Sequence, residues 1–325
     1  MRQVLATETL KTGERMEIER VTPPDAERAA QILPFLAHKP PNYRGHIDRA
    51  FAGETDDLET HFYIGLIGDE MVGNIMTVET NGVGVFGHVH TRSDQRRKGI
   101  CSAIMRRQME DFRQRNGRVL LLGTGYQSAP YYIYASYGFQ DWKPHVPGRM
   151  RYDNPADPEF EARFFAPAEY QVAPARWKHW PLVALLAAIP GPAYFRSFTF
   201  DLWGVGLMEG PYSKFLHENG ARPEVSALVL ESATGAVAAI ATAIPDPRTH
   251  GDVRLLDIFA HPGVGAAYLA GLLHALPSVP MQSYADPNDA AKIGALENAG
   301  FRRGAVLPHQ FREGDAWRDL WLYAR

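Results

Sequence analysis

The sequence predicts two α/β domains in tandem, each built on a mixed, mostly antiparallel central sheet flanked by helices. Its 325 residues suffice for about two domains of ordinary size. Each half repeats one order of segments: antiparallel strands, a long helix, a further strand and a short helix that ends at Gly-Phe, at 138–139 and 300–301. One order of elements repeated over half the chain indicates a tandem duplication.

Composition and charge exclude several classes of protein. The chain is 45% hydrophobic and 22% charged, which is typical of a globular protein. Its net charge of −3 argues against a general nucleic-acid binder, which would carry a basic excess. The single cysteine, Cys101, excludes an internal disulfide framework and is typical of a reducing compartment.

The sequence carries no signal for secretion or for membrane insertion. Residues 1–21 are charged and mixed, and they lack the apolar core of a signal peptide. The most apolar segment, 181–189, ends at Pro190 and is far shorter than the ~20 residues of a membrane span. We therefore expect a cytoplasmic protein with no membrane partner.

The first elements of the first half form an antiparallel meander. Alternation over 16–21 predicts a short strand, and residues 22–37 predict a helix because Pro-Pro opens them and acidic residues lie in the first turn. Gly-Asp-Glu and Asn-Gly separate the next apolar segments and are hairpin signals. The other elements expected are a helix near 44–53 and strands at 61–67, 71–80 and 82–91.

The rest of this half alternates helix and strand. Apolar residues fall at helical spacing over 100–116, and Gly117 is a suitable helix stop. The continuous apolar segment 118–124 is typical of a central strand covered on both faces. Residues 128–138 predict a short helix, because a serine caps them and a proline follows in the first turn. A last hairpin includes 148–153.

Three prolines and several acids in 153–168 indicate a connector between domains. We therefore predict a first domain over 14–153, a linker over 154–168 and a second domain over 169–325. The second domain is expected to contain helices at 177–189, 264–276 and 288–301, and strands at 225–232, 236–244, 252–261, 281–285 and 320–325.

The turn SDQRRKGICSAI, residues 93–104, is the most telling stretch of the sequence. It joins a strand to a long helix, whose first N–H groups and positive dipole end form a site for an anion. Arg96, Arg97 and Lys98 add positive charge at its rim. The spacing is not that of a Walker loop. A solvated basic loop and a nucleic-acid patch are the alternatives, and the mildly acidic chain disfavours the second.

Residues 89–105 resemble the acetyl-CoA-binding motif of the GNAT N-acetyltransferases, which has Gln or Arg, two residues, Gly, one residue, and Gly or Ala. Arg96, Gly99 and Cys101 occupy its fixed positions. Cysteine departs from the pattern but is small. IYASYGF, 133–139, is similar to the second hallmark of the family, an aromatic-containing helix that ends in Gly-Phe. The resemblance covers about residues 14–152.

The resemblance implies acetyl-CoA as the cosubstrate, bound where strands 82–91 and 118–124 separate. The backbone of Val89 and Thr91 would pair with the pantetheine arm like an added strand. Amides of about 97–102 would hold the pyrophosphate. The residues expected to bind acetyl-CoA are Val89, His90, Thr91, Arg96, Arg97, Lys98, Gly99, Ile100, Cys101 and Ser102.

The resemblance also implies direct transfer of the acetyl group to an amine, with Tyr134 as the general acid that protonates the departing CoA thiolate. A packing role for this tyrosine is the alternative. The general base stays open. His88 and His90 are the nearest titratable groups and have a suitable pKa, whereas Glu79 and Asp94 are weaker candidates.

The second half departs from the motif. No arginine or lysine precedes Gly263 and Gly265 within DIFAHPGVGAAYLAGLL, and ALENAGF has no tyrosine at the position that corresponds to Tyr134. We expect this domain to have lost donor binding and either to shape the acceptor site or to mediate dimerisation. Its aromatic residues, Trp177, Trp180, Phe195, Phe198, Phe200 and Trp203, are expected in its core or around an acceptor pocket.

We therefore predict an N-acetyltransferase that moves an acetyl group from acetyl-CoA to a primary amine of a small molecule. The rival hypotheses are a non-catalytic acyl-CoA sensor and an acyltransferase for another acyl-CoA or a protein amine. No metal is expected, because His88 and His90 have no third ligand at a telling spacing. A reactive Cys101 is not needed for direct transfer. The oligomeric state stays open, with a homodimer as the commonest soluble assembly.

Overall fold

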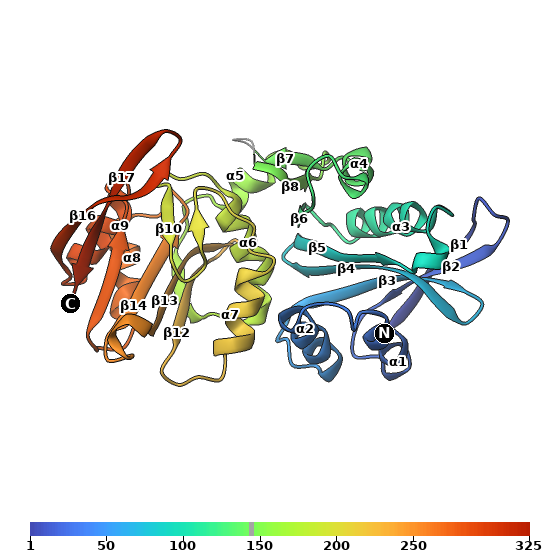
Figure 1. Cartoon of the computed structure of the whole chain (residues 1–325), viewed down its shortest axis with the longest axis horizontal. Coiled ribbons are helices and arrows are strands. Elements are labelled where there is room, and N and C mark those ends of the chain that lie inside the picture. Colours follow the sequence, from blue (N-terminus) through green and yellow to red (C-terminus); the bar gives the residue numbers. More distant parts are fainter. Residues whose placement is uncertain (143–145) are drawn as a thin grey trace. The chain divides into compact units, whose positions relative to one another are not determined.

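The computed structural model describes residues 1–142 and 146–325 (Figure 1). Contacts within the chain divide it into two compact units. Unit 1 comprises Met1–Pro158 and Arg176–Leu182, and unit 2 comprises Glu159–Ala175 and Val183–Arg325. The predicted fold class is confirmed, because each unit has a large, mostly antiparallel sheet flanked by helices.

Unit 1 contains an eight-stranded sheet in the order β1-β2-β3-β4-β5-β6-β8-β7. Among the residues that the structure describes, only β5 and β6 are parallel neighbours, and the other pairs are antiparallel. The strands are β1 (Arg2–Thr9), β2 (Arg15–Val21), β3 (Glu59–Ile67), β4 (Glu70–Thr80), β5 (Val83–Thr91), β6 (Val119–Gly123), β7 (Gln140–Trp142) and β8 (Val146–Asp153).

Helix α3 lies on one face of this sheet, and α1 and α2 lie on the other (Figure 1). The apolar positions predicted for the long helix are those that α3 buries against Met16, Ile18 and Ile75. Burial of each such side chain contributes about 1.5–3 kcal/mol. The helices are α1 (Ala26–Phe35), α2 (Pro41–Ala52), α3 (Ile100–Gln114) and α4 (Ala129–Ser136), with 3₁₀ turns η1 (Ser93–Gln95) and η2 (Trp177–His179).

Two glycines let α3 approach the sheet closely. Gly65 of β3 and Gly73 of β4 are cross-strand partners. A Cβ at Gly73 would lie 2.8 Å from side-chain carbons of Ile100 and Ile104, and a Cβ at Gly65 would lie 3.1 Å from Ile104. Side chains at this pair would therefore crowd Ile100 and Ile104 and, at Gly65, also the Met16 sulfur (2.8 Å). The glycine pair thus leaves room for the first turns of α3 close to β3 and β4.

Strand β1 was not predicted from the sequence. It is a mostly exposed edge strand that pairs antiparallel with β2, and it lacks the apolar run that would reveal a buried strand. The turn between β1 and β2 reaches the turn before α3. There the Lys11 N–H donates to the carbonyl of Lys98 (3.4 Å), and the Lys98 ammonium pairs with Glu14 (2.8 Å).

The observed units differ from the predicted boundaries around the connector. Residues 176–182 belong to unit 1, where Trp177 and Trp180 pack their rings on His46 of α2. Asp56 accepts a hydrogen bond from the Trp177 N–H (2.9 Å). The prediction that these two tryptophans belong to the second domain is therefore wrong: their aromatic contacts are made to unit 1.

Unit 2 contains a seven-stranded sheet in the order β16-β17-β15-β14-β13-β12-β9, in which only β14 and β15 are parallel, and a separate β10-β11 ribbon. None of the helices that the described residues form has the length and apolar character of a membrane span. The elements of this half are α5 (Phe160–Phe164), β9 (Tyr170–Pro174), α6 (Trp180–Ala188), β10 (Phe195–Ser197), β11 (Leu202–Trp203), α7 (Pro211–Asn219), β12 (Ser226–Ser232), β13 (Val237–Pro245), η3 (Pro247–Thr249), β14 (Arg254–Ala260), α8 (Ala266–His274), β15 (Met281–Ala285), α9 (Ala290–Asn298), β16 (Arg302–Glu313) and β17 (Ala316–Ala324).

Candidate active site

Strands β5 and β6 of unit 1 pair over only part of their length. Their parallel register joins Val83 to Val119 and ends at Val85 and Leu121. Strand β5 continues to Thr91. The second half of β5 is therefore unpaired on the side of β6, and its backbone is available to another extended chain.

A bulge in β5 accounts for this separation. Gly87 lies opposite Met76 of β4, but His90 lies opposite Asn74, so β5 has one residue more than β4 over this stretch. His88, inside the bulge, has a φ of 51°. The Asn74 side-chain amide donates to the carbonyl of His88 (3.0 Å). Bulges of this kind bend a strand and end its pairing.

The turn after β5 presents an uncapped helix N-terminus. Gly99 is the N-cap of α3 with a φ of 91°, and no side chain caps this end of the helix. The Gly99 carbonyl accepts the N–H of Ala103 (3.0 Å). The amides of Gly99, Ile100, Cys101 and Ser102 therefore have no acceptor within the helix, which makes this end a site for an anion.

These features enclose a cavity of about 490 Å³, within the range of small-ligand pockets. The cavity brings together every residue predicted to bind acetyl-CoA except Lys98, whose ammonium pairs with Glu14. Its lining residues are Lys11, Val89, His90, Thr91, Gln95, Arg96, Arg97, Gly99, Ile100, Cys101, Ser102, Ala129, Pro130 and Ile133.

Several lining residues were missed by the sequence analysis. Lys11 comes from the turn after β1, a strand that the sequence pattern did not reveal. Ala129, Pro130 and Ile133 come from the first turns of α4, which the sequence predicted as a helix without assigning it a wall of the site. Only the chain fold brings these positions to the turn 93–104, so no local motif could have found them.

His90 lines the cavity, and its ring also packs against residues at the end of α1. Its ring centroid lies 4.3 Å from that of His38 and 5.1 Å from that of Phe35. Burial, and then the nearby His38 and Lys39, lower the pKa of His90. The ring is therefore neutral at pH 7 and is able to accept a proton.

His88 has a different environment. It is buried, and its ring lies edge-on to Tyr43 of α2, with 4.8 Å between ring centroids. Burial lowers the pKa of His88 to about 3, with smaller contributions from Lys39, His46 and His38. Such a histidine stays neutral over the physiological range. Of the two predicted histidines, His90 is the one that the structure places at the cavity wall.

Tyr134 follows the lining residue Ile133 on α4 and is 6% exposed. Its ring packs edge-on against Phe86 of β5 (5.4 Å between centroids) and near Phe139. The ring of Tyr134 therefore packs from α4 onto the strand that carries the bulge, and the residue is not one of those that line the cavity.

The environment of the Cys101 thiol disfavours a role as a nucleophile. Burial raises its pKa to about 11, so almost none of it is thiolate at neutral pH. The weaker base candidates are also engaged. Arg92 donates to Asp94 (2.8 Å) and lowers the pKa of that carboxyl, and Arg115 binds Glu79 (2.7 Å).

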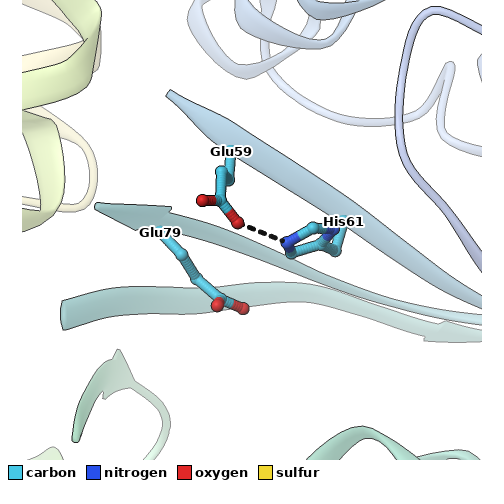
Figure 2. A group of neighbouring side chains, drawn as sticks. All are labelled: Glu59, His61 and Glu79. Carbon is cyan, nitrogen blue, oxygen red and sulfur yellow. Dashed lines mark hydrogen bonds and ion pairs between the residues drawn. The ribbon is translucent and has the colours of Figure 1, made fainter. Parts of the chain in front are cut away.

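A second polar cluster of unit 1 contains Glu59, His61 and Glu79, whose possible ligand atoms lie within 4.8 Å of one another (Figure 2). Glu59 and Glu79 are cross-strand partners on β3 and β4, so two like charges face each other. His61, two residues further along β3, contacts Glu59 (3.3 Å) and Thr22 (2.9 Å). The group has the composition of a metal site.

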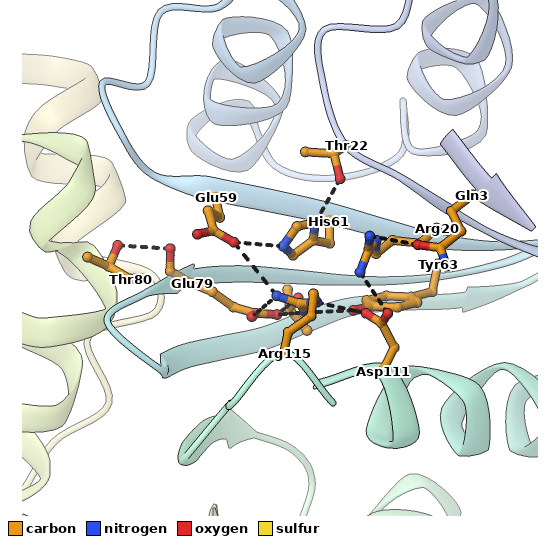
Figure 3. Close-up of polar contacts among 11 residues, drawn as sticks. Gln3, Arg20, Thr22, Glu59, His61, Tyr63, Glu79, Thr80, Asp111 and Arg115 are labelled. Carbon is orange, nitrogen blue, oxygen red and sulfur yellow. Dashed lines mark hydrogen bonds and ion pairs between the residues drawn. The ribbon is translucent and has the colours of Figure 1, made fainter. Parts of the chain in front are cut away.

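The Arg115 guanidinium occupies the position beside these carboxylates that a metal cation would take (Figure 3). Its guanidinium donates to both carboxylate oxygens of Glu79 (2.7 and 2.9 Å) and to the Tyr63 hydroxyl (2.9 Å), and it lies 3.7 Å from Glu59. Its Nε donates to Asp111 (2.9 Å). We interpret the cluster as a structural ion network, and the expectation of a metal-free protein stays a prediction.

Unit 2 has a much smaller cavity at the corresponding place. The parallel pairing of β14 and β15 also ends early, at Leu256 and Ser283. The cavity beside this point measures about 60 Å³ and is lined by Arg196, Lys292 and the end of β14. Lys292 lies eight residues before Gly300, and the lining residue Pro130 lies eight before Gly138. A long buried side chain thus stands where unit 1 has a proline.

Comparison with known proteins gives matches among solved structures only. No family model and no curated protein matches the chain. The GNAT-family acetyltransferase from Streptococcus pneumoniae is 16% identical, with a TM-score of 0.37, over 48% of this chain and 98% of that one. The N-acetyltransferase from Staphylococcus aureus Mu50 is 16% identical, with a TM-score of 0.38, over 49% and 98%.

A third similar structure is a GNAT-superfamily phosphinothricin acetyltransferase from Sinorhizobium meliloti in complex with AcCoA. It is 18% identical, with a TM-score of 0.39, over 48% of this chain and 87% of that one. Solved structures of GNAT acetyltransferases are thus similar to about half of this chain. This is the family that the motif at Arg96, Gly99 and Cys101 resembles.

Proposed function

We propose that the protein is an N-acetyltransferase that moves the acetyl group of acetyl-CoA directly to a primary amine of a small molecule. The observation that carries the proposal is the cavity of about 490 Å³, which joins an unpaired strand edge to an uncapped helix N-terminus. An extended arm with a diphosphate at its end would use both features, the strand edge for the arm and the helix N-terminus for the diphosphate.

Each part of the donor has a matching surface. The amides at the start of α3 would hold the pyrophosphate, with Arg96 and Arg97 supplying positive charge. The backbone of Val89 and Thr91 would bond to the amides of the pantetheine arm. The Arg96 Nε donates to the Thr91 carbonyl (3.4 Å), which ties the phosphate-binding turn to the strand edge.

Transfer needs one proton acceptor and one proton donor. The neutral amine attacks the thioester carbonyl carbon, a C–N bond forms, and the C–S bond breaks as the thiolate leaves. His90, neutral at the cavity wall, would take the proton that the amine loses. Tyr134 would give its hydroxyl proton to the thiolate. Cys101, a thiol with a raised pKa, is left out of the reaction.

We further infer that unit 2 does not bind the donor. The counterpart cavity of about 60 Å³ is too small for a pantetheine arm, because Lys292 and Arg196 fill the gap beside β14. Both side chains are buried. This supports a single donor site in the chain.

A titration of acetyl-CoA by calorimetry tests the proposal, with wild type, Gly99→Glu and Gly53→Glu. Gly53 ends α2 with a φ of 74°, and a Cβ added there would have no atom within 4 Å, so it matches the backbone strain of Gly99, at a φ of 91°. The strain costs each variant about 1 kcal/mol. Only Gly99→Glu puts a carboxylate at the proposed pyrophosphate site at the start of α3, so only that variant should lose acetyl-CoA binding.

The outcomes separate the rival hypotheses. If wild type binds no CoA ester, the cavity is not a donor site and the proposal fails. If wild type binds acetyl-CoA but releases no free thiol with any amine, the protein is an acyl-CoA sensor. If longer acyl-CoA esters turn over faster than acetyl-CoA, it is a different acyltransferase.

A further inference from the structure

Among the described residues that line the cavity, Lys11 is the cation to which the proposed function gives no role. It comes from the turn between β1 and β2, whereas Arg96 and Arg97 come from the turn before α3. A Cβ added at Gly99, the N-cap of α3, would lie 3.8 Å from the Lys11 Cγ and 3.9 Å from its Cε. The side chain of Lys11 therefore runs past the end of the helix where the pyrophosphate would bind.

Contacts on both sides of Lys11 hold this turn in place. Leu10 is buried in the core of unit 1. The Lys11 N–H donates to the Lys98 carbonyl (3.4 Å), and the Lys98 ammonium pairs with Glu14 (2.8 Å). The turn is thus tied to the segment that leads into α3, so the position of Lys11 at the helix N-terminus is part of the fold.

The Lys11 ammonium has no carboxylate within 4 Å in the described part of the chain. The acidic residues nearest to it in sequence have other partners. Glu14 pairs with Lys98, and Glu8 of β1 pairs with Arg106 of α3 (3.1 Å). The described wall of the cavity contains three side chains that are always cationic at neutral pH and no aspartate or glutamate. Such a wall favours a ligand with several negative charges.

Acetyl-CoA, the donor in the proposed function, carries one phosphate besides its pyrophosphate. This third phosphate is a monoester on the 3′ oxygen of the ribose, so it lies at the nucleotide end of the donor, away from the thioester. Its second pKa is about 6, and it therefore carries about 1.5–2 negative charges at pH 7. A lysine ammonium is a suitable partner for such a group, because it acts as a point charge.

We propose that Lys11 binds the 3′-phosphate of the donor, so that the protein selects CoA esters over esters of dephospho-CoA. This rests on the proposed function, because it assigns the unused cation of the cavity to the unused phosphate of the donor. With acetyl-CoA, the ammonium gains a charge-assisted hydrogen bond. With an ester of dephospho-CoA, the exposed ammonium stays in water. That ester should therefore bind only through its pyrophosphate and its pantetheine arm.

Calorimetric titrations of acetyl-CoA and of acetyl-dephospho-CoA at pH 7.5 test the inference on wild type, Lys11→Met and Lys214→Met. Methionine keeps an unbranched apolar stem beside Gly99 and removes the charge. Lys214→Met makes the same change of net charge on the exposed surface of α7 in unit 2, outside the cavity wall. The two ligands differ only in the 3′-phosphate, so the ratio of their affinities isolates its contribution in each protein.

We expect wild type and Lys214→Met to bind acetyl-CoA about tenfold more tightly than acetyl-dephospho-CoA, as one hydrogen bond between charged groups allows. Lys11→Met should reduce this preference to about twofold or less by weakening the binding of acetyl-CoA, because its affinity for acetyl-dephospho-CoA has no 3′-phosphate contact to lose. The wild-type preference should also shrink in about 1 M salt, where charges are screened within about 3 Å. A merely structural role of Lys11 would weaken both ligands equally and leave their ratio unchanged.

The results distinguish this inference from the proposed function. If wild type binds the two esters equally, or if Lys11→Met keeps the wild-type preference, the inference is wrong while the donor site stands. If wild type binds neither ester, the proposed function is overturned, and the inference falls with it.

Discussion

Replacing Arg115 by methionine should destabilise unit 1 strongly. Arg115 is the only cation within 4 Å of Glu79 among the described residues, and the Glu79 side chain is only 6% exposed. Burial alone would lower the pKa of Arg115, but Glu79 raises this pKa well above its ordinary value. Without the guanidinium, the buried Glu79 faces Glu59 across two strands without its ion-pair partner.

The magnitude follows from what each carboxylate retains. Removing one partner of a buried ion pair costs about 3–5 kcal/mol. Asp111 keeps Arg20 (2.7 Å) and the Tyr63 hydroxyl (2.7 Å), so its loss is small. Within the described part of the chain, Glu79 keeps only the hydroxyl of Thr77 (2.5 Å) as a side-chain donor. We therefore expect the lower end of that range, about 3 kcal/mol.

The hydrogen bond from His61, and then the charges of His61 and Arg115, lower the pKa of Glu59. Its stabilisation of the fold is therefore present above the ordinary glutamate pKa and is lost as the pH falls through the lowered one. The difference between wild type and Arg115→Met should accordingly be larger at pH 7.5 than at pH 5, where the orphaned carboxylates of the variant begin to take up protons.

Hydrogen exchange of the β3 and β4 amides is the suitable assay, because the chain has two units and a global unfolding signal would mix them. A loss of about 3 kcal/mol corresponds to roughly hundredfold faster exchange. Glu79→Gln combined with Arg115→Met should recover part of the loss. Less than about fivefold faster exchange at pH 7.5, or no recovery in the double variant, would refute the reasoning.

Three further predictions concern the reaction. Tyr134→Phe should lower kcat about a hundredfold or more with acetyl-CoA affinity unchanged, and an unaltered kcat would exclude its hydroxyl as the acid. Because burial and then His38 and Lys39 lower the pKa of His90, kcat/KM should fall only below about pH 6.5, the ordinary histidine value. His90→Gln should abolish this acidic limb, and its persistence would assign the limb to another group. With a pKa of about 11, Cys101 should react with iodoacetamide at pH 7.5 at less than about a hundredth of the rate of free cysteine, and Cys101→Ala should stay active. Rapid labelling would contradict the burial of the thiol.

The parts of the site that sequence reasoning found are those encoded locally. The strand, turn and helix over 82–116 follow from one change of hydrophobic period, and the glycine at the turn follows from a backbone conformation that other residues resist. The cavity adds Lys11, which lies far away in sequence. The structure also gives His88 and His90 different environments, since only His90 lines the cavity. The sequence could not predict this difference, because a bulge in β5 is not visible in a hydrophobic pattern of period two.

The ion network on β3, β4 and α3 also could not be predicted from local sequence. Arg20 and Asp111 lie 91 positions apart, and Glu79 and Arg115 lie 36 apart. Each charged residue alone is typical of a solvated surface. Only the close packing of α3 on the glycine pair of β3 and β4 makes them a buried set of partners. Sequence patterns predict faces of elements, and they do not predict which charges those faces bring together.

The two units share an opening in the sheet and differ in what borders it. In both, a parallel strand pair separates after three registered residues, so both sheets open at the same place. In unit 2 the opening is filled by Lys292, whose ammonium lies 3.4 Å from the Arg196 carbonyl and 5.3 Å from the centre of the Phe195 ring. Arg196 in turn donates to the carbonyls of Ala187 and Ile189 (3.0 Å each). Such buried cations are tolerated because carbonyls and a ring face receive them, and the same groups leave no room for a ligand. The opening in the sheet is thus a property of the fold, whereas an open cavity depends on the side chains that border it.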